Sequence, residues 1–188
     1  MAQHTRLAVP VSERDHQQGP ETAAVTLVQY GDYECPYTRQ STWVVQAIQK
    51  QLGDQLRFVF RNFPLTEIHP HALHAALAVE AAASQGKFWQ MHDYTFHHQH
   101  SLEDSDLVRF AEALGLDLQQ YTNDVALQRF LPHIEEDVES GQRSGVQGTP
   151  TFFINEVMYR GSWEHDALLT ALQPAQATAL ARTRKSRD

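Results

Sequence analysis

The sequence lacks three features, and each absence narrows what the protein can do. It has a single cysteine, Cys35, in 188 residues, so any disulfide must join that cysteine to another molecule. It has no run of about 18 apolar residues, so we expect no helix that crosses a membrane. It has no excess of basic residues, since its net charge is −8, and we therefore expect no nucleic-acid partner.

The length and composition are typical of one soluble domain. Hydrophobic residues make up 41% of the chain and charged residues 20%. Residues 1–20 are mostly polar and predict an N-terminal arm, with one short strand near 7–11. Residues 174–188, which have a basic end, are expected to form a C-terminal tail. The N-terminus has no secretory leader pattern, so we expect a cytoplasmic protein.

The most informative stretch joins a strand, the cysteine and a helix. An apolar, β-branched run predicts a strand over 25–30. Pro36 opens a helical pattern over 36–52, because proline is favoured at the first position of a helix. Cys35 is therefore expected at the N-cap, where unpaired N–H groups and the helix dipole lower a cysteine pKa. Its polar neighbours favour an exposed, reactive thiol, and the alternative is a small buried hydrophobe.

The remaining segments predict a mixed α/β domain with helices in its middle. A strand over 56–61 follows the first helix, which gives a parallel βαβ unit. Residues from about 66 to 145 carry helical patterns throughout. Two short strands over 151–154 and 157–159 then form a hairpin, and a closing helix is expected over 164–172.

Local signals place helix boundaries within this middle region. Ser101 is expected to cap a helix over 102–114, because Asp104 completes the capping pattern three residues later. A last helix is expected over about 124–143. Pro132 lies inside it and should kink or divide it, since proline removes a backbone donor and clashes with the preceding turn.

Two motifs resemble those of the DsbA-like branch of the thioredoxin-fold thiol-disulfide oxidoreductases. Gly-Asp-Tyr-Glu-Cys-Pro-Tyr at 31–37 resembles the active-site opening of that family. The segment 145–155, which contains Gly-Thr-Pro-Thr, resembles its cis-proline loop and the strand that follows. The resemblance implies a thioredoxin-like α/β domain over 21–173 with a sheet of about four strands. It places the all-helical insert, about 66–145, between a βαβ half and a ββα half.

The resemblance also implies the site residues. Cys35 would be the nucleophile, and Pro36 and Tyr37 would shape the helix start and tune the thiolate. Pro150 would follow a cis peptide bond and pack against the cysteine. The backbone of Thr149 would then be able to pair with an extended substrate strand.

The fourth position of the motif departs from the family. The usual pattern is Cys-X-X-Cys, and this chain has Thr38 in place of the second cysteine. Thr38 cannot resolve a mixed disulfide, although its hydroxyl is expected to donate a hydrogen bond to the thiolate. We therefore expect monothiol exchange on protein or low-molecular-weight thiols and disulfides, with release by an external thiol such as glutathione. No cofactor is expected beyond glutathione as a co-substrate.

Two other functions fit the same residues. One is a glutathione transferase resembling the kappa class, in which bound glutathione supplies the sulfur. The other is a redox-silent module that binds a peptide or protein partner on a thioredoxin scaffold. The histidines, which gather at 69–74 and 97–100, are expected to have structural or surface roles, so no metal site is predicted.

Overall fold

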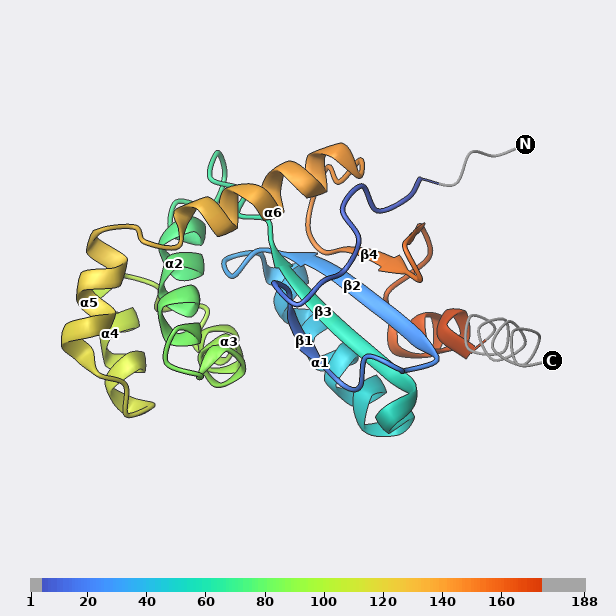
Figure 1. Cartoon of the computed structure of the whole chain (residues 1–188), viewed down its shortest axis with the longest axis horizontal. Helices are drawn as coiled ribbons and strands as arrows, with labels where there is room; N and C mark the ends of the chain where they lie inside the picture. The colour runs from blue at the N-terminus through green and yellow to red at the C-terminus, as the bar shows by residue number, and fades with distance from the viewer. Residues whose placement is uncertain (1–4, 174–188) are drawn as a thin grey trace.

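The structure is a computed structural model that describes residues 5–173; the predicted tail at 174–188 lies outside the described residues. It has a central five-stranded sheet with the strand order β1-β3-β2-β4-β5 and helices around it (Figure 1). The strands are β1 (His16–Gln18), β2 (Val25–Gly31), β3 (Leu56–Asn62), β4 (Thr151–Ile154) and β5 (Val157–Tyr159). The helices are α1 (Pro36–Leu52), η1 (Gly53–Gln55), α2 (Ala72–Ala83), α3 (Phe88–His97), α4 (Asp104–Ala113), α5 (Leu118–Ala126) and α6 (Leu131–Arg143).

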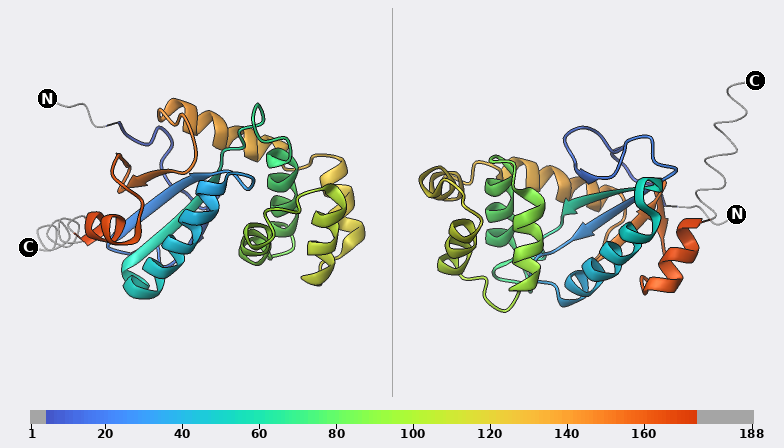
Figure 2. Two further views of the ribbon diagram at one scale, coloured as in Figure 1. Left: turned by 180° about the vertical axis from the view of Figure 1, so that it is seen from behind. Right: turned by 90° about the horizontal axis from the view of Figure 1, so that it is seen from below.

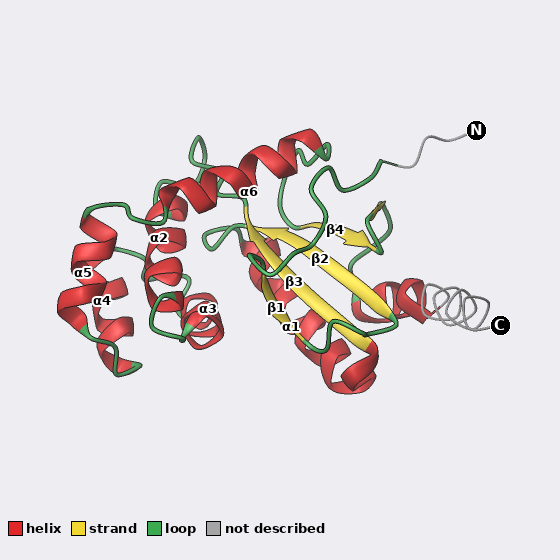
Figure 3. Ribbon diagram, in the orientation of Figure 1, coloured by secondary structure: helices red, strands yellow, loops and turns green. Residues whose placement is uncertain are grey.

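The predicted thioredoxin-like α/β class is confirmed by this topology. Strands β2 and β3 are parallel and are joined through α1, whereas β4 runs antiparallel to β2 and forms a hairpin with β5. The insert helices α2, α3, α4 and α5 gather beyond one end of the sheet, and α6 returns towards β4 (Figure 3). A final helical stretch covers residues 165–173. Within the described residues, no helix has both the length and the apolar character needed to cross a membrane.

Both faces of the sheet are covered, which explains the alternation of side chains along its strands. On one face Leu27 and Phe58 pack in a buried cluster with Ile48 of α1. On the other face Val28 and Val59 belong to a second buried cluster. The N-terminal segment crosses that second face, opposite α1 (Figure 2). Successive strand residues point to opposite faces, so one strand serves both clusters.

The N-terminal arm differs from its prediction. No strand forms at 7–11, and the edge strand is instead β1, which pairs antiparallel with β3. The sheet consequently has five strands rather than about four. An isolated bridge between Arg6 and Val157 holds the segment that precedes β1 against strand β5. The described part of the arm is therefore built into the domain.

A buried arginine holds this segment on the sheet. Arg61 of β3 donates from Nε and Nη2 to the carboxylate of Asp15, at 2.7 and 3.1 Å. Its remaining donors reach the carbonyls of Val9 and Pro10 and the hydroxyl of Tyr30. Burial, the largest single effect, lowers the pKa of Arg61, but the hydrogen bonds and charge interactions with Asp15 and Tyr30 together outweigh it, and the pKa is raised overall. All five guanidinium N–H groups are thus satisfied inside the protein.

Of two helix boundaries in the insert, one differs from expectation and the other agrees with it. The N-cap of α4 is Glu103, which forms a capping box with Asp106, so the prediction of Ser101 as the cap is wrong by two residues. The helix expected over 124–143 is divided next to Pro132, as predicted: α5 ends at Ala126, and Pro132 lies in the first turn of α6. Proline is tolerated there because the first N–H groups of a helix have no intrahelical partner.

Candidate active site

The local geometry places Cys35 where the sequence predicts it. Cys35 is the N-cap of α1, with φ −72° and ψ 120°, and Pro36 is the first residue of the helix. Its Sγ donates a hydrogen bond to the backbone oxygen of Thr149, at 3.3 Å. The peptide bond between Thr149 and Pro150 is cis. The structure therefore brings together the two motifs, which are 114 residues apart in the chain.

The exposure of the thiol differs from its prediction. Cys35 is only 3% exposed, whereas Tyr37, two residues later, is 59% exposed. The sulfur makes no hydrogen bond to the N–H groups of the helix, because it is turned towards the Thr149 carbonyl. Polar neighbours in the sequence indicated an exposed loop, but the segment around Thr149 covers the sulfur from a distant part of the chain.

The contacts of Thr38 also differ from the prediction that its hydroxyl donates a hydrogen bond to the sulfur of Cys35. Its side chain is fully buried, and its Oγ1 accepts a hydrogen bond from the backbone N–H of Asp32, at 3.4 Å. Among the described residues no hydrogen bond joins it to the sulfur of Cys35. Its backbone oxygen accepts bonds from the hydroxyls of Ser41 and Thr42 in the next turn. Thr38 is thus a packed residue of the helix start.

The loop before the cysteine is held by a buried carboxylate. Asp32 is 1% exposed, and its Oδ1 accepts from the N–H of Glu34, at 2.7 Å. Its Oδ2 accepts from the N–H of Leu65 and lies 2.8 Å from Nδ1 of His69. The carboxylate of Glu34 in turn accepts from the N–H of His71, at 2.6 Å. Both acidic side chains thereby fasten the cysteine loop to the segment that enters the insert.

The insert supplies a second clamp that sequence reasoning missed. Gln99 is buried, and its Nε2 donates to the backbone oxygens of both Tyr33 and Cys35, each at 2.9 Å. One amide group therefore satisfies two carbonyls on either side of Glu34. Nothing in the sequence around Gln99 identifies it, because it stands in a polar run at the end of a helix and its partners are more than 60 residues away.

A neutral histidine lies behind this loop. The hydroxyl of Tyr33 lies 2.9 Å from Nδ1 of His92, and both side chains are buried. Burial and, to a smaller extent, the nearby His16 lower the pKa of His92 to about 3. Burial also raises the pKa of Tyr33 well above its usual value. The His92 imidazole is consequently neutral near pH 7 and offers no positive charge to stabilise a thiolate.

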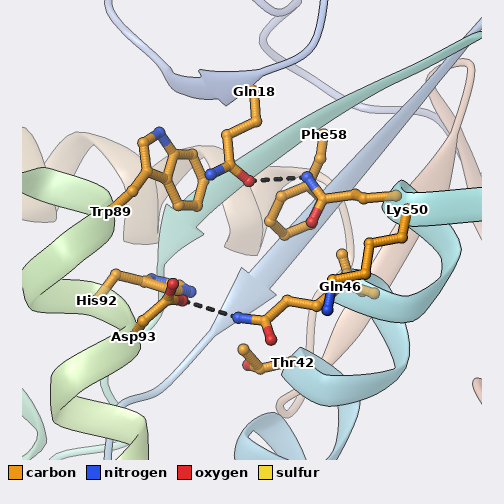
Figure 4. A pocket seen from close by; sticks show the side chains of 10 residues that line it. Gln18, Thr42, Gln46, Lys50, Phe58, Trp89, His92 and Asp93 are labelled. Carbon is orange, nitrogen blue, oxygen red and sulfur yellow. Dashed lines mark hydrogen bonds between the residues drawn. The ribbon is translucent and has the colours of Figure 1, made fainter. Parts of the chain in front are cut away.

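Two cavities lie near α1. One of 440 Å³ is flanked by Glu34 and Pro36, next to the cysteine, and by Gln99 and His71. Another of 490 Å³ lies between α1 and α3, where Gln46 donates to Asp93 at 3.0 Å across it (Figure 4). Cys35 itself is not among the residues that line either cavity.

The chain matches the sequence model of the thioredoxin family over residues 11–174 and belongs to that family. A thioredoxin-like oxidoreductase from Silicibacter pomeroyi has the same fold, with a TM-score of 0.75 and 28% identity over 93% of this chain and 94% of that one. BdbD from Bacillus subtilis gives a TM-score of 0.79 at 22% identity over 93% and 97% of the two chains. The predicted recognition is thus confirmed: the fold is that of the DsbA-like thiol-disulfide oxidoreductases.

Closer sequence relatives are much longer proteins. A Na⁺/H⁺ antiporter NhaA 3 from Salinispora tropica is 44% identical over 185 residues, which are 97% of this chain but 28% of that protein. A Na⁺/H⁺ antiporter NhaA from Herminiimonas arsenicoxydans is 39% identical over 164 residues, or 87% and 26% of the two chains. The chain therefore spans little more than a quarter of the length of these relatives.

Proposed function

We propose that this chain is a thiol-disulfide oxidoreductase that works by monothiol exchange at Cys35. The observation that supports the proposal most directly is the contact between Cys35 Sγ and the backbone oxygen of Thr149, at 3.3 Å. It joins the thiol at a helix N-terminus to the loop that contains Pro150. The fold of thiol-disulfide oxidoreductases adds to this support.

The exchange has two steps, and each conserves the number of disulfide bonds. The Cys35 thiolate attacks the glutathione sulfur of a protein–glutathione mixed disulfide, so that a Cys35–glutathione disulfide forms and the protein thiolate leaves and takes up a proton. The thiolate of a second glutathione then attacks the glutathione sulfur of that adduct. Glutathione disulfide is released and Cys35 returns as a thiolate. Glutathione is thus a co-substrate and supplies the reducing electrons.

The chain itself assists by placing groups rather than by acid–base chemistry. The first N–H groups of α1 lie beside Cys35 and have no intrahelical partners, so a thiolate that turns from the Thr149 carbonyl would meet them. The backbone of Thr149 would align the substrate as an added strand. Asp32 and Gln99 hold the cysteine loop in place during both steps.

The test follows the mass of the protein after incubation with glutathione disulfide. We expect one glutathione adduct per chain, removed by free glutathione and absent in Cys35→Ser. Thr38→Cys should change the product: it restores two cysteines three residues apart, so an internal disulfide should replace the adduct. Thr38→Val is the matched control, because it keeps the shape of the side chain and adds no thiol.

The burial of Cys35 favours one rival, the redox-silent binding module. If neither glutathione disulfide nor alkylating agents modify Cys35 in the folded protein, the exchange proposal fails and the binding module is favoured. If glutathione binds without forming a disulfide and still binds Cys35→Ser, the transferase resembling the kappa class is favoured instead. Cytoplasmic location stays a prediction.

A further inference from the structure

Two histidines and two carboxylates meet at a place that the proposed exchange does not use. The cluster contains His16 of β1, Glu80 of α2 and His133 of α6, whose ligand atoms all lie within 4.8 Å of one another. Nε2 of His16 lies 3.0 and 2.9 Å from the two oxygens of Glu80. Nε2 of His133 lies 3.8 Å from Glu80 and 3.9 Å from Oδ2 of Asp137, one turn further along α6.

The two carboxylates are buried with little positive charge around them. Glu80 is 3% exposed and Asp137 is 2% exposed. Within residues 5–173, no lysine or arginine forms an ion pair with Glu80, and Asp137 has only Arg14, at 3.7 Å. Buried carboxylates are normally paired or coordinate a metal ion, because leaving water is costly for a charge. A cation between these side chains would supply the missing positive charge.

Surrounding groups hold the possible ligands in position. Nδ2 of Asn62 donates to Oε1 of Glu80 at 2.7 Å and lies 3.4 Å from Oδ2 of Asp137. The ring of His16 stacks on Phe88 with a centroid separation of 3.5 Å and an interplanar angle of 9°. Such hydrogen bonds and contacts orient ligands in metal sites and raise the affinity of the site for the ion.

We propose that His16, Glu80 and His133 bind one divalent transition-metal ion beside Asp137, with Zn²⁺ as the best fit. Zn²⁺ takes imidazole nitrogen and carboxylate oxygen at about 2.0–2.2 Å in a tetrahedron, so its ligand atoms lie about 3.3 Å apart. The nitrogen–oxygen separations from Glu80 to His16 and His133, between 2.9 and 3.8 Å, bracket that value, and the three ligand atoms all lie within 4.8 Å of one another. Two imidazoles in the set favour Zn²⁺ over Ca²⁺ and Mg²⁺, which prefer oxygen ligands alone.

The bound ion would fasten three distant parts of the chain to one another. It would join edge strand β1 to α2 of the insert and to α6, which leads back to the sheet (Figure 1). The sequence gives no sign of this site, because its ligands come from separate segments and have no motif spacing. It departs from the expectation of no metal, which rested on the histidines at 69–74 and 97–100.

The test uses the full chain with Cys35→Ser, which removes the thiolate as a competing ligand. After treatment with a chelator, the protein is titrated with Zn²⁺ by calorimetry and its thermal unfolding is followed. We expect one ion per chain and a rise in Tm of about 5–10 °C at a free Zn²⁺ concentration 100 times Kd. His16→Gln and His133→Gln should each weaken binding by at least about tenfold. His74→Gln is the control, since His74 also contacts a carboxylate, of Asp104, but at an exposed place.

A measurement without substitutions at the ligands guards against variants that fail to fold. Co²⁺ in place of Zn²⁺ should broaden the imidazole NMR signals of His16 and His133 and leave that of His74 sharp. The proposal is overturned if Zn²⁺ does not bind one to one, or if both ligand variants bind it like the control. It is also overturned if Ca²⁺ raises Tm as much as Zn²⁺ in the Cys35→Ser protein, which keeps both histidines, or if Co²⁺ leaves the two signals unchanged.

Discussion

Removing the guanidinium of Arg61 should destabilise the protein strongly, and the structure sets the size of the effect. The side chains of Arg61 and Asp15 are 2% and 1% exposed, and they form a bidentate pair. Arg61→Met would fill much of the volume but leave a buried carboxylate without its counterion. Breaking a buried pair on one side typically costs about 3–5 kcal/mol of unfolding free energy.

This loss of unfolding free energy can be expressed as a decrease in melting temperature. For a chain of this size each kcal/mol corresponds to about 2–4 °C, so Arg61→Met should lower Tm by about 6–20 °C. Arg57→Met is the matched control on the same strand, because Arg57 Nε also reaches β1, donating to Oε1 of Gln17 at 2.7 Å. That arginine is only half-buried, and its replacement should cost less than about 1 kcal/mol.

A double-mutant cycle separates the interaction energy of the Arg61–Asp15 ion pair from the energy that each side chain contributes by packing. Asp15→Leu alone should also be costly, because it leaves a buried guanidinium unpaired. The double variant with Arg61→Met has no unpaired charge, so it should be less destabilised than the sum of the two changes. Urea unfolding of the four proteins measures this directly. The reasoning is refuted if either single change costs under about 1 kcal/mol, or if the two costs add within about 0.5 kcal/mol.

Three further predictions concern stability. Gln99→Ala leaves the buried carbonyl of Tyr33 without a donor, whereas the carbonyl of Cys35 keeps the N–H of Arg39 at 3.1 Å. The change should cost about 1–3 kcal/mol in urea unfolding, well above Gln85→Ala, whose amide bonds an exposed backbone. Gly141→Ala should cost about 1–3 kcal/mol because its Cβ would lie 2.7 Å from a phenylalanine ring, whereas Gly148→Ala meets nothing within 4 Å; equal Tm values would contradict this. His92 has its pKa lowered from 6.5 to about 3, so below pH 6.5 only the unfolded chain takes up its proton. Stability should therefore fall between pH 6.5 and 3, by up to about 1.4 kcal/mol per pH unit, and His92→Leu should flatten that slope.

Much of the fold could be predicted because local signals set its boundaries. Proline at the start and the helical pattern after it predict the helix over 36–52 as it is found. Edge strand β1 could not be predicted, since His-Gln-Gln has no apolar alternation and pairs only through its register with β3. Ser101 and Glu103 begin overlapping capping patterns, and the second is the one that forms, as a capping box between Glu103 and Asp106.

The site was predictable only as far as it is local. The strand, proline and helix place Cys35 at an N-cap without reference to the rest of the chain. Its burial depends on Thr149 and the amide of Gln99, which contact it from distant segments of the chain. No pattern in the sequence indicates these contacts. The hydrogen bond of the Thr38 hydroxyl likewise depends on the turn at Asp32, whose backbone N–H donates to it.

The separation of 114 residues between Cys35 and Thr149 has a consequence for synthesis on the ribosome. Translation at about 5–20 residues per second makes the cysteine about 6–23 seconds before the loop that covers it. The whole insert must be translated in that interval. The growing polypeptide therefore presents an uncovered sulfur that the finished protein hides, and that interval is when it is most open to unintended oxidation.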